Sequence, residues 1–180
     1  MKEEHLKMIK EGKIDDLVQS IENEAKSKPD DKQINQDLAS ILYLTGRVDD
    51  SIKLYEKLLK AYPDDPQLLV NVGLAYHNTG NDEAAINNFQ KVIEMAKTKP
   101  VKSLVLSLAH TNLGVVYVHK AQFELAVEEY KKAISIDGSN ELATKYLQQL
   151  KEWGDSDYGL VREIEMPDGT TRMNIWHYPS

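Results

Sequence analysis

The chain has no cysteine and no long apolar run. Because it has no thiol, the chain cannot contain disulfides, thiolate nucleophiles or sulfur-ligated zinc sites. No stretch approaches the ~20 consecutive apolar residues that a membrane-spanning helix needs, and residues 1–16 contain no apolar run that could serve as a signal peptide. We therefore expect a cytoplasmic protein that does not bind a membrane.

An excess of basic residues is absent as well. The 180 residues include 22 Lys and Arg against 29 Asp and Glu, which gives a formal net charge of −7. Because the phosphates of nucleic acids require a basic surface, we expect no nucleic-acid partner. Hydrophobic residues make up 41% of the chain and charged residues 28%, a balance typical of a folded globular domain.

Catalytic signatures are also missing. No stretch matches a phosphate loop, a nucleophile elbow or an HExxH metal helix, and the many carboxylates fall mostly on predicted outer helix faces. His77 and His119 lie near the ends of neighbouring predicted helices and could gather a metal with His177, or complete a catalytic site with the C-terminal tail. Their spacings are unrelated, which favours roles in polarity and hydrogen bonding. We predict no enzyme, no catalytic residue, no cofactor and no metal.

The feature that is present is an internal repeat. Residues 66–99 match the chain 34 positions earlier and again 41 positions later, with small, turn and aromatic residues in phase. A fixed period of this size is typical of stacked helical units, and three units in phase argue against accidental similarity in an ordinary helical bundle. The equivalent positions are Ala39, Gly73 and Gly114; Gly46, Gly80 and Ala121; Ser51, Ala85 and Ala126; and Tyr55, Phe89 and Tyr130.

Each repeated position has a physical reason. Gly73 leaves room for a second helix to approach closely, and Ala85 is the small residue expected opposite it. Gly80 can end the first helix in the left-handed conformation, and Asp65-Pro66 is typical of a helix start. On this basis Gly73 and Gly114 should accept alanine but not leucine, because a bulky side chain would separate the paired helices.

This pattern resembles the tetratricopeptide repeat (TPR) family, whose unit is a helix–turn–helix of 34 residues. The resemblance implies an all-α fold, a right-handed superhelical solenoid of helix–turn–helix units, to which the sequence adds a short C-terminal β-hairpin. It also implies a non-catalytic scaffold for protein–protein interaction that binds an unknown protein or an extended peptide in its concave groove. The 41-residue spacing resembles, in length only, the longer repeats of kinesin light chains.

The repeat phase divides the chain into six segments. The first is a degenerate capping repeat, because His5 and Leu17 stand where small residues are expected. Pro100 is expected to open the helix that follows the inserted residues. The segments are a cap at 1–31, repeats at 32–65, at 66–106 with a seven-residue insertion, and at 107–138, a solvating helix at 139–154, and a tail at 155–180.

The tail differs in kind from the rest of the chain. Met166-Pro167-Asp168-Gly169 is a turn signal, flanked by LVREIEM and TTRMNIWHY, which are rich in β-branched and aromatic residues. We predict a β-hairpin that must dock, because a lone two-stranded hairpin is marginal in water. A disordered tail is the alternative, although the apolar residues argue against it. They are Ile164, Met166, Ile175, Trp176 and Tyr178.

The resemblance also implies which residues line the groove. Asn71 and Asn112 take a place where such repeats often hydrogen-bond a peptide backbone, or they satisfy neighbouring helices. The predicted groove residues are Gln33, Gln36, Ser40 and Tyr43; Gln67, Val70, Asn71, Leu74, His77 and Asn78; and Leu108, Thr111, Asn112, Val115, Val118 and His119.

One departure from the family concerns charge. Members that bind the acidic C-terminus of heat-shock chaperones use Lys and Arg as a carboxylate clamp, whereas this chain has uncharged residues there: Gln36, Gln67, Leu108 and Asn112. We therefore expect a neutral groove, polar at its first end and apolar later. The competing hypothesis is a self-associating structural protein, in which the tail docks in its own or a neighbour's groove and can form a homo-oligomer.

Overall fold

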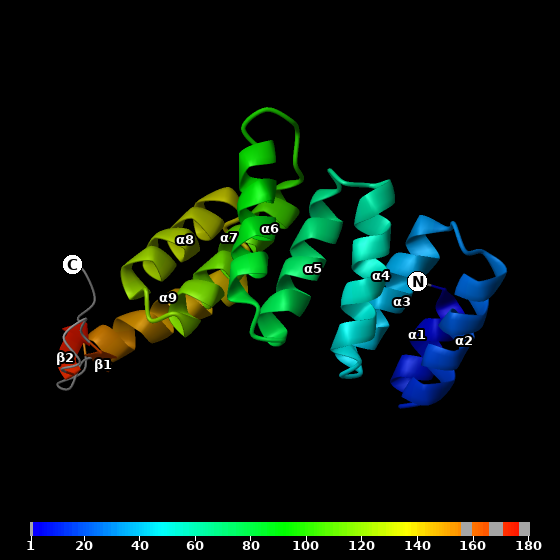
Figure 1. The fold of residues 1–180 in the computed structure, drawn as a ribbon, viewed down its shortest axis with the longest axis horizontal. Helices are drawn as coiled ribbons and strands as arrows, with labels where there is room; N and C mark the ends of the chain where they lie inside the picture. The colour runs from blue at the N-terminus through cyan, green and yellow to red at the C-terminus, as the bar shows by residue number, and fades with distance from the viewer. Residues whose placement is uncertain (1, 156–159, 166–170, 177–180) are drawn as a thin grey trace. The chain divides into compact units, whose positions relative to one another are not determined.

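The computed structural model describes residues 2–155, 160–165 and 171–176, which form helices followed by two strands (Figure 1). The helices are α1 (Glu3–Lys10), α2 (Ile14–Ser27), α3 (Lys32–Leu44), α4 (Val48–Ala61), α5 (Pro66–Asn78), α6 (Asp82–Met95), α7 (Ser103–His119), α8 (Phe123–Ile136) and α9 (Glu141–Gly154). The strands are β1 (Leu160–Glu165) and β2 (Thr171–Trp176). No helix among the described residues is long and apolar enough to cross a membrane.

The chain forms two compact units, Met1–Asn88 and Phe89–Ser180, with the boundary inside α6. In the first unit, α1 pairs with α2 and α3 with α4, and α5 packs on α4. In the second unit, α7 pairs with α8, and α9 packs on α8. The helices thus occur as the hairpins that the repeat predicts.

Three helices begin with the same capping device at equivalent repeat positions. The backbone N–H groups of Ile34 and Leu68 each donate to a carboxylate three residues earlier, Asp31 and Asp65, at 3.0 Å. Asn140 caps α9 in the same way, with its side-chain oxygen 2.9 Å from the Ala143 nitrogen. A side-chain acceptor here satisfies one of the N–H groups that a helix start leaves unpaired.

The turns within the helix pairs use a left-handed residue. Gly46 and Gly80 have φ values of 83° and 80°, a region that glycine adopts without strain. The equivalent residue after α7 is Ala121, with φ of 52°. Its Cβ makes this backbone conformation less favourable than it is for glycine.

The inserted residues lie at the start of α7. This helix has 17 residues, whereas α5 has 13, and the preceding connection covers residues 96–102, against 62–65 before α5. The insertion therefore lengthens both the helix and its connection. The prediction that Pro100 opens the helix is wrong, because α7 starts three residues later, at Ser103.

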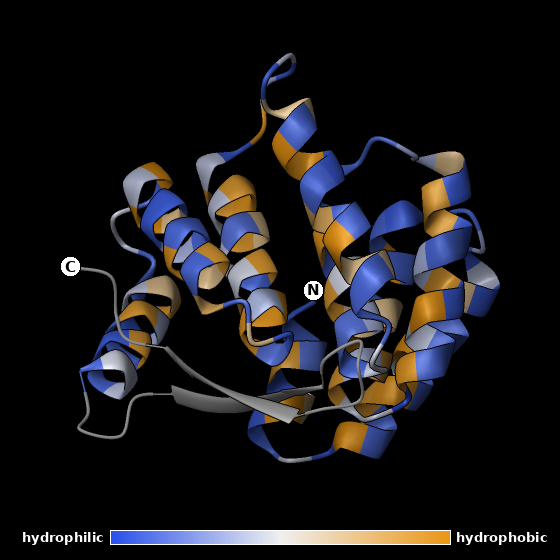
Figure 2. Ribbon diagram, turned by 60° about the vertical axis from the view of Figure 1, so that its left-hand side comes forward, coloured by the Kyte–Doolittle hydropathy of each residue, from blue (hydrophilic) through white to orange (hydrophobic). Residues whose placement is uncertain are grey.

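The first unit has two apolar cores on the inward stripes of its amphipathic helices, the alternation seen in Figure 2. One joins α2 to α3 through Leu17 and Leu42, and the other joins α3, α4 and α5 through Ala39, Tyr55 and Val72. Leu17 is fully buried although a small residue is expected at its position.

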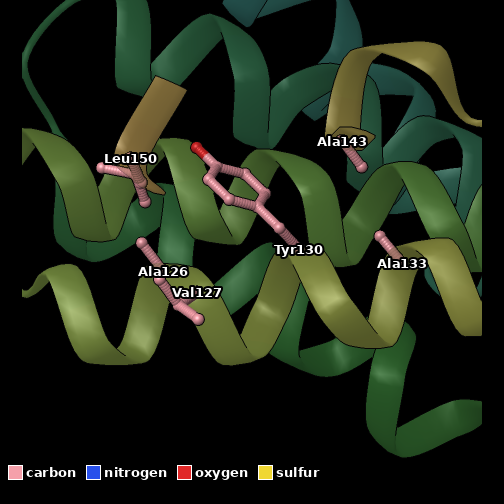
Figure 3. Packing of buried hydrophobic residues seen from close by; sticks show 6 residues of the cluster. All are labelled: Ala126, Val127, Tyr130, Ala133, Ala143 and Leu150. Carbon is pink, nitrogen blue, oxygen red and sulfur yellow. The ribbon is translucent and has the colours of Figure 1, made fainter. Parts of the chain in front are cut away.

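In the second unit, Tyr130 is at the centre of the core between α8 and α9, together with Leu150 and Ala133 (Figure 3). A Cβ placed on Gly114 would lie 2.5 Å from Tyr130 Cε1 and 2.8 Å from Cδ1. These distances are too short for unrelaxed contact, so the buried ring would have to shift to admit a Cβ. This contact argues against the expectation that Gly114 accepts alanine.

The two strands pair antiparallel. Their register sets Leu160 opposite Trp176, and Val161 opposite Ile175. The predicted turn, Met166-Pro167-Asp168-Gly169, and Tyr178 lie outside the described residues.

Candidate protein-interaction surface

In the first unit, the first helices of the two full repeats, α3 and α5, carry a row of polar side chains that hydrogen-bond to one another. The hydroxyls of Ser40 and Tyr55 lie 2.8 Å apart, and Asn71 also contacts the Tyr55 hydroxyl. The Gln67 amide donates to Asn71 Oδ1 at 2.9 Å. Two successive first helices, α3 and α5, therefore share a hydrogen-bonded surface whose side chains have fixed orientations.

Tyr43 continues this row. Its hydroxyl accepts a hydrogen bond from Asn78 Nδ2 at 3.3 Å, again joining α3 to α5. Burial raises the pKa of Tyr43, so its hydroxyl remains protonated and can donate to a ligand. The surface thus offers both donors and acceptors in un-ionised form.

The predicted groove residues differ widely in exposure. Val70 and Thr111 are buried, so they cannot form part of an open surface. Thr111 donates to the Ser107 carbonyl oxygen at 2.9 Å and accepts from Asn140 Nδ2 at 2.9 Å, so it belongs to the core of the second unit. Gln33, Asn78 and His119 are exposed, and the rest are partly buried: Gln36, Ser40, Tyr43, Gln67, Asn71, Leu74, His77, Leu108, Asn112, Val115 and Val118.

A polar pocket of about 340 Å³ lies in the first unit, among α1, α2 and α3. Gln33, a predicted groove residue, lines it together with His5, Glu24 and Asp37, which were not predicted. Asp37 could have been found from its spacing, since it lies one helical turn after Gln33 and the two side chains hydrogen-bond at 2.9 Å. His5 and Glu24 depend on how the degenerate cap packs, which the repeat pattern does not define.

This pocket contains a cluster of ionisable groups. His5 is 3% exposed, with Nε2 3.1 Å from Glu24 Oε1, and the Lys2 ammonium lies 2.6 Å from the same oxygen. The hydrogen bond from Lys2 is the main cause that holds the pKa of Glu24 below its usual value. The cluster ties the cap helix α1 to α2.

Two of these residues, His5 and Glu24, could gather a metal ion together with Glu4. Glu4, His5 and Glu24 place one ligand atom each within 4.8 Å of one another. Lys2, however, lies within 3.7 Å of Glu4 Oε1 as well, so its ammonium fills the place of a cation. His5 Nδ1 is buried without a partner, whereas the second nitrogen of a metal-bound histidine normally donates a hydrogen bond. This arrangement fits an ion pair better than a metal site.

The predicted histidine cluster is not described as a whole. His177 lies outside the described residues. His77 Nδ1 lies 2.7 Å from Asp82 Oδ1 within the first unit, which agrees with a role in hydrogen bonding.

The second unit has a smaller pocket, of about 170 Å³. Tyr130 and Tyr146 form part of its wall, with ring centroids 5.6 Å apart. Burial is the main cause that raises the pKa of Tyr130, with a smaller contribution from Tyr146. Trp153 is 45% exposed at the end of α9, so the pocket presents open aromatic surface. The lining residues are Val115, Val118, Tyr130, Tyr146, Gln149, Leu150 and Trp153.

Paired helices with small residues at their contacts are the architecture of a helical-repeat protein. The model of the tetratricopeptide repeat family matches residues 33–98 and 64–139. The chain therefore belongs to the tetratricopeptide repeat family. A search of curated proteins by sequence finds no match.

Solved structures share the fold at low identity. A crystal structure of MamA is similar with a TM-score of 0.64 and 22% identity, covering 82% of this chain and 77% of that one. A chain of the APC/C hetero-tetramer Cut9-Hcn1 has a TM-score of 0.67 and 16% identity, and the match covers 81% of this chain and 28% of that one. The first TPR domain of Spaghetti (RPAP3), bound to the HSP90 peptide SRMEEVD, gives 0.57 and 19%, covering 66% and 88%.

Proposed function

We propose that this protein is a non-catalytic interaction module that binds an extended, largely uncharged segment of a partner protein on the inner face of its first helices. The hydrogen-bonded row on α3 and α5 carries the proposal. Its side chains are ordered before any ligand binds, so binding costs less conformational entropy. They also remain partly exposed, so they can still contact a ligand.

Asn71 is the residue best placed to contact a peptide backbone. Its side-chain oxygen accepts from Gln67 and its amide contacts Tyr55, which fixes the plane of the amide. An oxygen has two lone pairs and an NH₂ group two protons, so each group can make one further bond. An extended peptide offers both partners, a backbone N–H and a C=O.

The charge of the groove sets the kind of segment that fits. The RPAP3 domain binds an acidic peptide, SRMEEVD. In this chain the positions corresponding to the family's clamp, among them Gln36 and Gln67 on the first unit, are uncharged. Without cations to make charge-assisted bonds, an acidic C-terminus gains little here. Binding should therefore depend weakly on salt concentration.

The test is a peptide array of uncharged and acidic extended segments, followed by fluorescence anisotropy on the peptides that bind. Asn71→Ala should weaken binding of an uncharged peptide about tenfold, the loss of one or two hydrogen bonds. The matched control is Asn87→Ala, which changes an exposed asparagine on a second helix, α6. Equal affinity in the two variants, or preferential and salt-sensitive binding of acidic peptides, would contradict the proposal.

A further inference from the structure

We propose that the two-stranded segment of this chain, residues 160–176, docks its apolar end in the second unit's pocket on α7, α8 and α9. The proposal does not rest on the proposed function, because it concerns a contact of the chain with itself. It rests on three observations: the nature of the pocket, the register of the strands, and the length of chain between them.

The pocket is apolar and open on the side of α9. Val115 and Val118 form one wall, and Gln149 is its one amide. Trp153 lies at the last turn of α9 with almost half its surface exposed. An apolar pocket of this kind can accept an aromatic or aliphatic side chain.

The register sets two wholly apolar pairs next to each other at one end of the strands. Leu160 pairs with Trp176, and Val161 with Ile175. Each of the other four pairs contains one charged residue: Arg162 pairs with Asn174, Glu163 with Met173, Ile164 with Arg172, and Glu165 with Thr171. The ribbon therefore has an apolar end and a charged end.

The apolar end is the one tied to α9. Residues 155–159 separate the last residue of α9, Gly154, from the first of β1, Leu160. An extended chain of this length spans at most ~20 Å, so Leu160 lies within that distance of the end of α9 whatever path the connection takes. Short tethers give effective concentrations in the millimolar range, so even weak contacts fill the pocket.

Docking also supplies what the ribbon lacks alone. A two-stranded sheet is marginal in water and becomes stable when one part packs on another element. The pocket lined by Trp153 is an apolar surface within reach of the tether. Because Val115 and Val118 are also predicted groove residues, a docked ribbon covers this part of the inner face and competes with any partner that uses it.

The absence of native cysteine allows a direct test by disulfide trapping in the full-length chain. Cysteines are placed at Gln149, which lines the pocket, and at Asn174 on β2. The matched control pairs Asn174→Cys with Gln148→Cys, the same residue type one position earlier on α9, exposed and outside the pocket lining. Both pairs are equilibrated in glutathione buffers at micromolar protein concentration, and products are resolved on non-reducing gels.

We expect the intramolecular disulfide to be at least tenfold more favoured for the Gln149 pair than for the Gln148 pair. Trp176→Ser, added to the Gln149 pair, should lower its intramolecular disulfide to nearly the level of the Gln148 pair. The substitution removes an apolar residue from the docking end and leaves the helices unchanged. Equal trapping in the two pairs, or a preference that Trp176→Ser leaves unchanged, would overturn the proposal. A disulfide-linked dimer as the main product would overturn it too, by assigning the pocket to a second copy.

Discussion

Two junctions at the same place in the repeat are built from opposite chemistry. In the first unit the capping carboxylate of α5, Asp65, accepts a hydrogen bond from the Lys32 ammonium. In the second unit the equivalent cap of α9 is Asn140, whose amide donates to Ser107 Oγ at 2.7 Å, and Ser107 stands where Lys32 does. The first junction is partly open, with the Lys32 side chain 37% exposed. The second is buried, with Ser107 fully buried and Asn140 8% exposed.

The buried junction requires a neutral donor. The Ser107 hydroxyl donates to the Ala133 carbonyl oxygen at 2.9 Å, and the Thr111 hydroxyl donates to the Ser107 carbonyl oxygen. Both hydroxyl oxygens therefore face Asn140 as acceptors, and its amide supplies both protons. The comparison shows that one capping position can be served by an ion pair only where water reaches it, and otherwise needs a complete neutral network.

The largest effect is expected from giving the buried junction the chemistry of the open one. Asn140→Asp places a buried carboxylate against two acceptor oxygens, and should cost on the order of 3 kcal/mol in the free energy of unfolding at pH 7. Burial beside two acceptor oxygens raises the pKa of the new carboxyl in the folded state, so the loss should shrink as the pH falls. Urea unfolding at pH 7 and pH 5 measures both. A loss below about 1 kcal/mol would show that the hydroxyls reorient freely.

The next effect concerns a second equivalent pair. Tyr55 packs against Ala39, whereas Tyr130 packs against Gly114, with no room for a Cβ. Gly114→Ala should therefore destabilise the chain by about 1–3 kcal/mol, even though alanine favours helix. Adding Tyr130→Leu should make the alanine nearly neutral, because the ring atoms that it meets are gone. Additive losses in the double variant, measured by thermal unfolding, would contradict the close contact.

The reciprocal change at the open junction should cost less. Asp65→Asn keeps an acceptor for the Leu68 N–H but weakens the bond to Lys32, at a cost of about 0.5–1 kcal/mol. Burial by itself would raise the pKa of Asp65, but the Lys32 and Leu68 hydrogen bonds outweigh it and lower the pKa. This stabilisation is therefore present above the unfolded pKa of about 3.9 and is lost as the pH falls through the lower folded value.

The measurement is the free energy of unfolding of wild type and Asp65→Asn between pH 7 and pH 2.5. The difference in the free energy of unfolding between the two proteins should shrink at the acid end, as Asp65 becomes protonated. A difference that stays constant over this range would show that Lys32 contributes nothing through charge.

The smallest effect concerns the turns. Ala121 adopts the left-handed conformation that glycine has at the equivalent positions 46 and 80. Ala121→Gly should stabilise the chain by up to about 1 kcal/mol by removing Cβ strain, offset in part by the greater entropy of glycine in the unfolded chain. Gly80→Ala, the reverse change, should destabilise it by a similar amount. If both variants melt at the wild-type temperature, the residue type at these left-handed turns does not affect the stability of either unit.

The repeat positions were accessible from the sequence because each rests on a local rule. Asp65-Pro66, Gly46 and Gly80 appear in the structure as a cap and as left-handed turn residues, as predicted. The start of α7 was predicted wrongly because the first turn of a helix tolerates proline, but a proline such as Pro100 does not by itself start a helix. The seven extra residues carry no repeat phase that could correct it.

What the sequence could not show is which partner each side chain meets. Thr111 falls in phase with Gln36, a partly exposed residue, yet it is buried because Asn140 reaches it across the helix pair. Likewise the tight contact of Gly114 with Tyr130 depends on the distance between two helices, which no spacing rule provides. His5 was recognised as a departure, but its burial against Glu24 follows from the packing of the cap.

The central claim, that the inner face of the first helices binds an extended uncharged segment, is tested most directly by an NMR titration. The full-length, ¹⁵N-labelled chain is titrated with an uncharged peptide chosen from the array, and backbone amide shifts are followed. The account predicts saturable shifts centred on α3 and α5, largest near Ser40, Gln67 and Asn71, and an about tenfold higher peptide concentration for half-saturation in Asn71→Ala. Shifts centred on the second helices α2 and α4, unchanged by Asn71→Ala, would contradict it.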